Sequence, residues 1–273
     1  MTEGDTFEAN SYWENRLREN PTIKGVGFFS LAASFNTWMY RVRKPVFDAV
    51  VRKYGLANPS SKVLDAGSGT GFYIERWRSL GAVGVQGLDL TRASADMLAQ
   101  RFPDVPFHVA DIGDPDALLK LAIAPESLDA VSCMDVLFHI VDDERFDAAL
   151  HNIADLLRPG GIFILSDNFV HGEAIRLSHH VSRSLDTYLE CLAVHGFEVL
   201  ERRPMFIHMN APVDDPDQTR QVRWMRMMER FARTELRGRV TGLAMYPLER
   251  FLVAIRKESP TTEIMVCRKS VKS

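Results

Sequence analysis

Three glycines at alternate positions form the part of the sequence best suited to bind a ligand. They are Gly67, Gly69 and Gly71, and they follow the apolar pair Val63-Leu64, which fits the end of a buried parallel strand. The next segment, Phe72–Trp77, fits a helix. Glycine lets the backbone turn tightly and a ligand come close, and a helix N-terminus offers free N–H groups. The pattern predicts a small-molecule site at the carboxyl end of a strand.

Several kinds of loop contain glycines at such spacing. A phosphate-binding P-loop ends in Gly-Lys-Ser/Thr, which Phe72 after Gly71 excludes. A dinucleotide loop reads G-x-G-x-x-G, and Phe72 replaces its third glycine. Residues 63–71 closely resemble the nucleoside-binding loop of class I S-adenosylmethionine (SAM)-dependent methyltransferases. That resemblance implies that SAM is bound by Asp65, Gly67, Ser68, Gly69 and Gly71. A tight turn without a ligand is the remaining alternative.

An acidic residue follows the glycine loop by about 20 positions. Asp89 and Leu90 end the apolar segment 83–90, which predicts a second strand, and a helix is predicted over 93–101. At this spacing a carboxylate is expected to accept the ribose hydroxyls of a nucleoside. Its alternative role is to cap the helix that follows.

A third strand is predicted over 106–111. Asp111 and Ile112 at its end resemble the adenine-binding step of the same family, where a carboxylate accepts from the adenine amino group and an apolar side chain packs on the ring. An aspartate that begins a turn before Gly113 is the alternative interpretation.

The segment 128–140 resembles the fourth motif of these methyltransferases. The resemblance implies that Met134 contacts the cofactor and that Asp135 lies on the substrate side. His139 follows closely, and a histidine titrates near neutral pH, so it could take a proton from a nucleophile. Alternatively, His139 caps or packs against the next helix.

A helix predicted over 142–157 is stopped by Arg158-Pro159-Gly160-Gly161, and a fifth strand is predicted over 162–166. This helix–turn–strand run is typical of the same family. The chain then leaves the predicted sheet on the ligand side, which makes His171 a second candidate base.

A long helix is predicted over 34–53, because apolar residues recur there at three- and four-residue steps. Asn36, Tyr40 and Arg43 fall on a different stripe of this helix. The stripe is either solvated or, if residues 1–58 cap the cofactor pocket, in contact with ligand, which would put Tyr40 on the substrate side.

The C-terminal part departs from a minimal core. A helix is predicted over 182–195, a strand over 197–202, and an amphipathic helix over 217–237 whose buried side is expected to hold Trp224, Met228, Phe231 and Ala232. Its opposite side carries Arg220, Arg223, Arg226, Arg230, Arg233 and Arg237. This arginine stripe suggests an anionic substrate or a membrane surface, whereas a solvated lid helix is the alternative.

A last helix is predicted over 246–257, followed by a strand over 263–268. The apolar side chains expected to face inward from this helix are Leu248, Phe251, Leu252 and Ile255.

The alternation of strands and helices predicts a doubly wound α/β fold. The resemblance implies seven strands, mostly parallel, with the last inserted antiparallel. We expect one methyltransferase domain with a helical cap (1–58), a SAM-binding core (59–203), a helical insert or lid (204–245) and a closing helix and strand (246–273).

Composition narrows the functional classes. The 273-residue chain has a net charge of −3, which gives no global attraction to nucleic acid. Its three cysteines include no C-x-x-C pair, so we expect neither a structural metal nor disulfides. Residues 1–5 are polar, unlike a signal peptide, and no segment reaches the ~20 apolar residues of a membrane span. A cytoplasmic protein is expected.

We therefore expect a SAM-dependent methyltransferase that acts on a small molecule or a glycan, the latter anionic if the arginine stripe binds it. The transfer is expected to be to oxygen. N- or C-methylation, a NAD-dependent oxidoreductase and a non-catalytic methyltransferase-like protein remain open.

Overall fold

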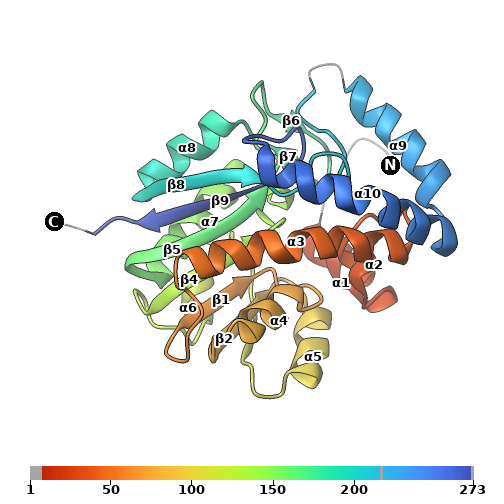
Figure 1. The fold of residues 1–273 in the computed structure, drawn as a ribbon. Coiled ribbons are helices and arrows are strands. Elements are labelled where there is room, and N and C mark those ends of the chain that lie inside the picture. Colours follow the sequence, from red (N-terminus) through yellow and green to blue (C-terminus); the bar gives the residue numbers. More distant parts are fainter. Residues whose placement is uncertain (1–7, 216–217, 272–273) are drawn as a thin grey trace.

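A seven-stranded sheet forms the centre of the molecule (Figure 1). The computed structural model describes residues 8–215 and 218–271, so the polar N-terminus and the predicted helix start at Asp217 lie outside it. The strand order is β3-β2-β1-β4-β5-β9-β8. The strands are β1 (Lys62–Ala66), β2 (Gly84–Asp89), β3 (Phe107–Val109), β4 (Leu128–Met134), β5 (Leu157–Asp167), β8 (Phe197–Pro204) and β9 (Glu263–Lys269).

Strands β3, β2, β1, β4 and β5 pair in parallel, whereas β9 runs antiparallel between β5 and β8. This confirms the predicted fold class. The carboxyl ends of β1, β2 and β4 therefore lie together at one edge of the sheet. A separate two-stranded sheet of β6 (Ile175–Arg176) and β7 (Val181–Ser182) was not expected.

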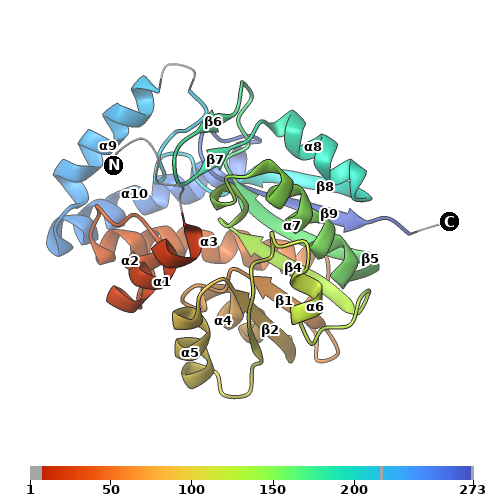
Figure 2. The same ribbon diagram turned by 180° about the vertical axis from the view of Figure 1, so that it is seen from behind.

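Helices cover both faces of the sheet. Helices α3, α4 and α10 lie on the face seen in Figure 1, and α6, α7 and α8 lie on the face seen in Figure 2. The helices are α1 (Ala9–Glu19), α2 (Ile23–Val26), α3 (Ala33–Lys53), α4 (Phe72–Ser79), α5 (Arg92–Arg101), α6 (Ala117–Lys120), α7 (Asp143–Leu156), α8 (Leu185–Val194), α9 (Thr219–Ala232) and α10 (Glu235–Ile255), with a 3₁₀ turn η1 (Leu137–His139).

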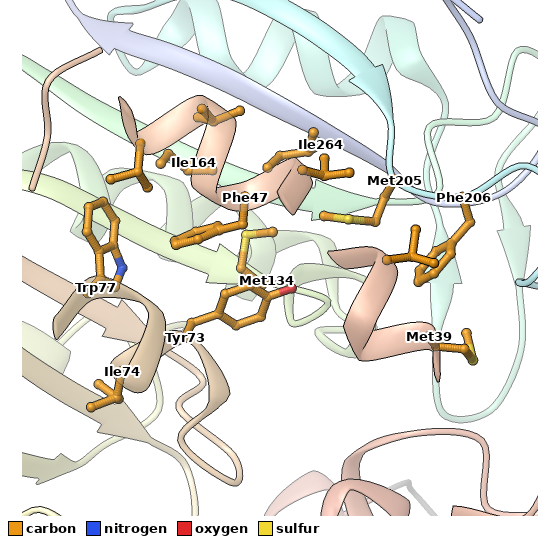
Figure 3. Packing of buried hydrophobic residues seen from close by; sticks show 14 of the residues in the cluster. Met39, Phe47, Tyr73, Ile74, Trp77, Met134, Ile164, Met205, Phe206 and Ile264 are labelled. Atoms are coloured by element: carbon orange, nitrogen blue, oxygen red, sulfur yellow. The ribbon is translucent and has the colours of Figure 1, made fainter. Parts of the chain in front are cut away.

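Helix α3 supplies much of one hydrophobic core. Phe47 is fully buried and its ring lies 4.8 Å from that of Tyr73 and 5.3 Å from that of Trp77, both on α4. Figure 3 shows these rings beside Met134 of β4. Burying a large apolar side chain contributes about 1.5–3 kcal/mol, so this apolar face anchors α3 to the sheet.

The fifth strand is longer than predicted. It begins at Leu157 rather than at Ile162, because Leu157 already pairs with Leu128 of β4. Gly160 adopts a φ of +77°, and the register between β4 and β5 shifts at this point. The Arg-Pro-Gly-Gly run thus ends the helix as predicted but lies inside the sheet as an irregularity of the strand.

The two C-terminal helices have different bounds from the predicted 217–237 and 246–257. Helix α9 ends at Ala232, and α10 then continues across the boundary predicted at residue 245. The Glu235 carboxylate accepts hydrogen bonds from the N–H groups of Ala33 and Ser34, which fixes the start of α10 against α3. A Cβ at Gly242 would lie 2.1 Å from the Trp38 ring, so glycine permits this close packing.

The predicted inward face of the last helix is wrong for three of its four residues, whereas Leu252 is partly buried and packs against the core. Leu248, Phe251 and Ile255 are 56%, 59% and 57% exposed, whereas Glu249 and Val253 are buried. The Glu249 carboxylate accepts hydrogen bonds from the N–H groups of residues 207, 208 and 209. This polar anchor fixes the rotation of α10, and apolar periodicity alone could not reveal it.

The buried side of the arginine-rich helix agrees better with its prediction. Trp224, Met228 and Ala232 are buried as expected, but Phe231 is 51% exposed. Phe231 lies at the end of α9, where the chain turns into α10 and its carbonyl accepts a hydrogen bond from the Thr241 hydroxyl.

The Glu249 anchor gives a test of stability. We expect Glu249→Ala to lower the free energy of unfolding by about 3 kcal/mol, because several buried N–H groups lose a charged acceptor. Urea unfolding measures the change. Glu229→Ala on the exposed side of α9 is the control and should be nearly neutral. An equal effect of the two substitutions would contradict the anchor role.

Candidate functional site

A cavity of about 930 Å³ opens at the sheet edge where β1, β2 and β4 end. Its walls come from the glycine loop, from α1 to α3 and from the segment 210–213. This volume is in the range of cofactor and small-molecule sites. Most residues singled out in the sequence line it: Tyr40, Gly67, Ser68, Gly69, Asp89, Leu90, Asp111, Ile112, Met134, Asp135 and His139.

The glycine loop needs its glycines for steric reasons. Gly67, Gly69 and Gly71 have φ values of +82°, +51° and +80°, which other residues rarely adopt. A Cβ at Gly67 would lie 2.2 Å from Val136, and one at Gly71 would lie 2.5 Å from Leu98. Gly71 precedes the first turn of α4 and does not line the cavity, in contrast to Gly67 and Gly69.

Asp89 joins the second strand to this loop. One carboxylate oxygen accepts the Gly69 N–H at 2.8 Å, and the other accepts the Thr91 N–H and hydroxyl at 2.9 and 2.7 Å. Burial raises the pKa of Asp89 above its ordinary value. The residue that caps α5 is Thr91, whose hydroxyl accepts the Ser94 N–H, so the capping interpretation of Asp89 is wrong.

Asp65 lies behind the loop and is not among the lining residues. Its Oδ1 accepts the Ser132 hydroxyl at 2.7 Å, and Ser132 in turn accepts the Trp77 indole N–H at 2.9 Å. Burial raises the pKa of Asp65 to about 7. The side chain thereby links β1 to β4 and α4 under the cavity floor.

Asp111 and Ile112 line the cavity wall, and Asp111 also stabilises a turn. Asp111 accepts the Gly113 N–H at 2.8 Å, as the turn interpretation predicted, and its other oxygen pairs with Arg145 at 2.6 Å. Ile112 is buried beside it. The two interpretations of this aspartate are therefore compatible.

The far side of the cavity contains a compensated charge pair. Asp135 has a φ of +59° and accepts the Ser166 hydroxyl at 2.7 Å, while its second oxygen pairs with Arg43 at 2.5 Å. Arg43 is buried, and its Nε has no hydrogen-bond partner among the described residues. The Asn36–Tyr40–Arg43 stripe thus lines the cavity rather than facing solvent.

Tyr40 is another polar group that α3 brings to the cavity. Burial raises the pKa of Tyr40 to about 12. It therefore keeps its hydroxyl proton at neutral pH.

His139 lies in η1 at the cavity wall. Its Nδ1 is 3.1 Å from the His179 carbonyl, and its ring packs edge-on to Trp13 at 4.7 Å. Because a carbonyl can only accept, Nδ1 carries the proton and Nε2 keeps its lone pair. Burial lowers the pKa of His139 to about 3, so the imidazole is neutral near pH 7.

His171 does not reach the cavity. It is 45% exposed in its side chain and pairs through Nδ1 with Asp214 at 2.7 Å. The Asp214 hydrogen bond raises the pKa of His171. The structure thus separates the two candidate bases, because the loop after β5 turns outward.

Several residues in or beside the cavity were not singled out in the sequence. Helix α1 lines part of the cavity, and it is held there because the Asn10 amide donates to the Leu90 carbonyl at 2.9 Å and Glu14 accepts the Ala93 N–H at 3.1 Å. A second group is a buried polar chain in which the Asn210 amide donates to Thr262 and Thr262 donates to Asn168. These residues come from distant segments, so no local spacing connects them.

The arginine stripe lies outside the cavity. Among its neighbours on α9 only Gln221 is a lining residue. Within the described part of the chain, no three histidine, cysteine or acidic side chains are grouped so that they could hold a metal ion.

With this geometry established, comparison with known proteins identifies the class of domain. Residues 63–161 match the family described as "Methyltransferase domain". The resemblance to class I SAM-dependent methyltransferases is thereby confirmed, and the chain carries a methyltransferase domain of this class.

Two curated relatives are each 33% identical to part of the chain. One is dTDP-4-amino-2,3,4,6-tetradeoxy-D-glucose N,N-dimethyltransferase of Saccharopolyspora spinosa, over 45% of this chain and 53% of that protein. The other is the ubiquinone biosynthesis O-methyltransferase of Cupriavidus pinatubonensis, over 56% and 53%. The chain thus spans about half the length of these curated relatives.

A solved structure shares the fold. It is the Haemonchus contortus phosphoethanolamine N-methyltransferase 2 in complex with S-adenosyl-L-methionine, with a TM-score of 0.57 and 16% identity. The match covers 99% of this chain and 62% of the other. At this identity the likeness concerns the fold alone.

Asp89 provides a direct test of the site. We expect Asp89→Ala to weaken binding of S-adenosylhomocysteine by about 1–3 kcal/mol, because a buried charged acceptor is lost. Calorimetric titration measures the affinity. Asp96→Ala, at an exposed position of α5, is the control and should bind as the wild type does. Unchanged affinity of Asp89→Ala would refute the ribose role.

The buried imidazole predicts a pH effect on stability. The folded pKa of His139 is near 3, and an unfolded histidine has a pKa of about 6.5, so the unfolded chain binds more protons between these values. The protein should lose stability from this source as the pH falls through that window. Urea unfolding of His139→Gln should show a smaller loss on acidification than the wild type. Parallel pH curves for both would contradict the assignment.

Proposed function

We propose that the chain binds SAM in this cavity and transfers its methyl group to a hydroxyl of a small, uncharged, polyhydroxylated molecule. The proposal rests on the class I domain at residues 63–161 and on relatives whose names include O- and N-methyltransferases. The bound SAM supplies a methyl group that is already activated as a sulfonium.

The cavity has suitable groups for such a cofactor. Asp89 accepts three hydrogen bonds from the protein, and the oxygen that accepts the Gly69 N–H keeps a lone pair for a ribose hydroxyl. Asp111 and Ile112 would lie against the adenine, and Gly67 and Gly69, which have no side chains, would let the ligand approach the backbone of the loop closely.

The observation that carries the choice of acceptor is charge compensation. Asp135 is paired with Arg43, and His139 is neutral, so these two groups bring no net charge to the acceptor wall. A neutral hydroxyl fits beside these groups, whereas an ammonium would find the Asp135 carboxylate already paired with Arg43. The amide and hydroxyl groups of Asn168, Asn210 and Thr262 suit a ligand with several hydroxyls.

His139 would act on the attacking oxygen. Its Nε2 lone pair can accept a hydrogen bond from the hydroxyl and hold it in line. An imidazole of low pKa is a weak base, but the hydroxyl would become strongly acidic as its oxygen forms a third bond, to the methyl carbon, while the bond from that carbon to the sulfonium sulfur breaks. The proton therefore passes to His139 late in the transfer.

N-methylation is the second candidate, because the Saccharopolyspora spinosa relative is an N,N-dimethyltransferase of an amino sugar nucleotide. A transfer assay with labelled SAM separates the two. Labelled products from alcohols but not from matched amines support O-methylation, and the reverse selectivity overturns it.

Once an acceptor is found, His139 can be tested by turnover. We expect His139→Ala to lower kcat about 10²-fold, the lower range for a positioned base, with little change in affinity for S-adenosylhomocysteine. His171→Ala is the matched control and should keep its kcat, because His171 lies outside the cavity. Full activity of His139→Ala would remove the imidazole from the mechanism.

A further inference from the structure

Helix α10 presents an apolar face to solvent along almost its whole length. Leu236, Val240, Leu243, Leu248, Phe251 and Ile255 are each between 56% and 75% exposed. At 100° per residue they fall on one side of the helix, opposite the buried Gly242, Glu249 and Val253.

This face is unusual in size. Figure 1 shows α10 beside α3 at the outside of the molecule. With a rise of about 1.5 Å per residue, the face extends for about 30 Å. Exposed apolar surfaces of this extent mark interaction sites. Phe231 and Met227 of α9 add to it at 51% and 45% exposure.

Positive charge is concentrated in the two helices that carry the apolar face. The helical pair 219–256 contains nine arginines and three glutamates, whereas the whole chain has a net charge of −3. Two of the glutamates are engaged inward, Glu235 with the N-terminus of α3 and Glu249 with residues 207–209. The rest of the chain is therefore acidic, and the positive charge is concentrated here.

The positive charge favours one of two candidate partners for this apolar face. A second copy packed on α10 would bring two arginine-rich surfaces together, and like charges oppose such a pairing. An anionic bilayer offers an apolar interior for the leucines and phenylalanines and phosphates for the arginines.

We propose that α9 and α10 dock the protein on the surface of an anionic lipid bilayer. The helices lie in the plane of the surface, since no described helix is long and apolar enough to cross a membrane. Leu243, Leu248 and Phe251 enter the acyl boundary, and Arg226, Arg230 and Arg237 contact lipid phosphates.

Vesicle sedimentation tests this proposal without reference to catalysis. Wild-type protein should bind vesicles of mixed phosphatidylglycerol and phosphatidylcholine at low salt and should not bind phosphatidylcholine alone. The variant Leu243→Glu/Phe251→Glu and the variant Arg226→Glu/Arg230→Glu should each lose binding about tenfold or more.

The matched control is Val83→Glu/Leu119→Glu, which changes two apolar residues that are 73% and 85% exposed elsewhere. It should bind as the wild type does. Unfolding midpoints identify any variant that fails to fold. If one of the two helix variants fails to fold, vesicle binding of the other helix variant decides the test.

Two outcomes overturn the proposal. One is that the wild-type protein does not bind anionic vesicles, or that the helix variants bind them as well as the control does. The other is a wild-type dimer that Leu243→Glu/Phe251→Glu makes monomeric while vesicles have no effect, which would identify a second copy as the occupant.

Discussion

The cavity depends on the absence of two Cβ atoms. At Gly67 and Gly71 the backbone passes so close to Val136 and Leu98 that any larger residue would push the loop away from the end of β4 or from α5. With the loop this close to the end of β4 and to α5, the Gly69 N–H reaches the Asp89 carboxylate. The close packing at the two glycines therefore holds β1, β2 and the start of α4 together as one rigid wall. Both the sheet edge and the cavity depend on this wall.

The opposite wall is organised by electrostatics. Arg43 is carried by α3, which precedes the sheet in the sequence, and Asp135 stands just after β4. Neither charge could be buried alone at acceptable cost. Their pairing holds α3 over the end of β4, and neither of the two groups leaves a net charge on this wall.

Local patterns predicted the parts of the fold that depend on local physics. The glycine loop, Asp89 and the strand–helix alternation each follow from spacing within about 20 residues. Other features depend on partners far along the chain. The rotation of α10 follows from Glu249 and residues 207–209, the place of Asp65 from Ser132, and the exclusion of His171 from Asp214. Apolar periodicity describes a helix face but does not say which long-range polar contact will turn it.

Helix α1 joins the two halves of the cavity. It bridges the nucleoside half of the cavity through Asn10 and Glu14 and contacts the acceptor half through Trp13 and His139. Arg16 holds the same helix further to the carbonyls of Gly25 and Gly27, and Leu17 is buried. One short element thus contacts both halves of the cavity, so any movement of this helix changes the two halves together.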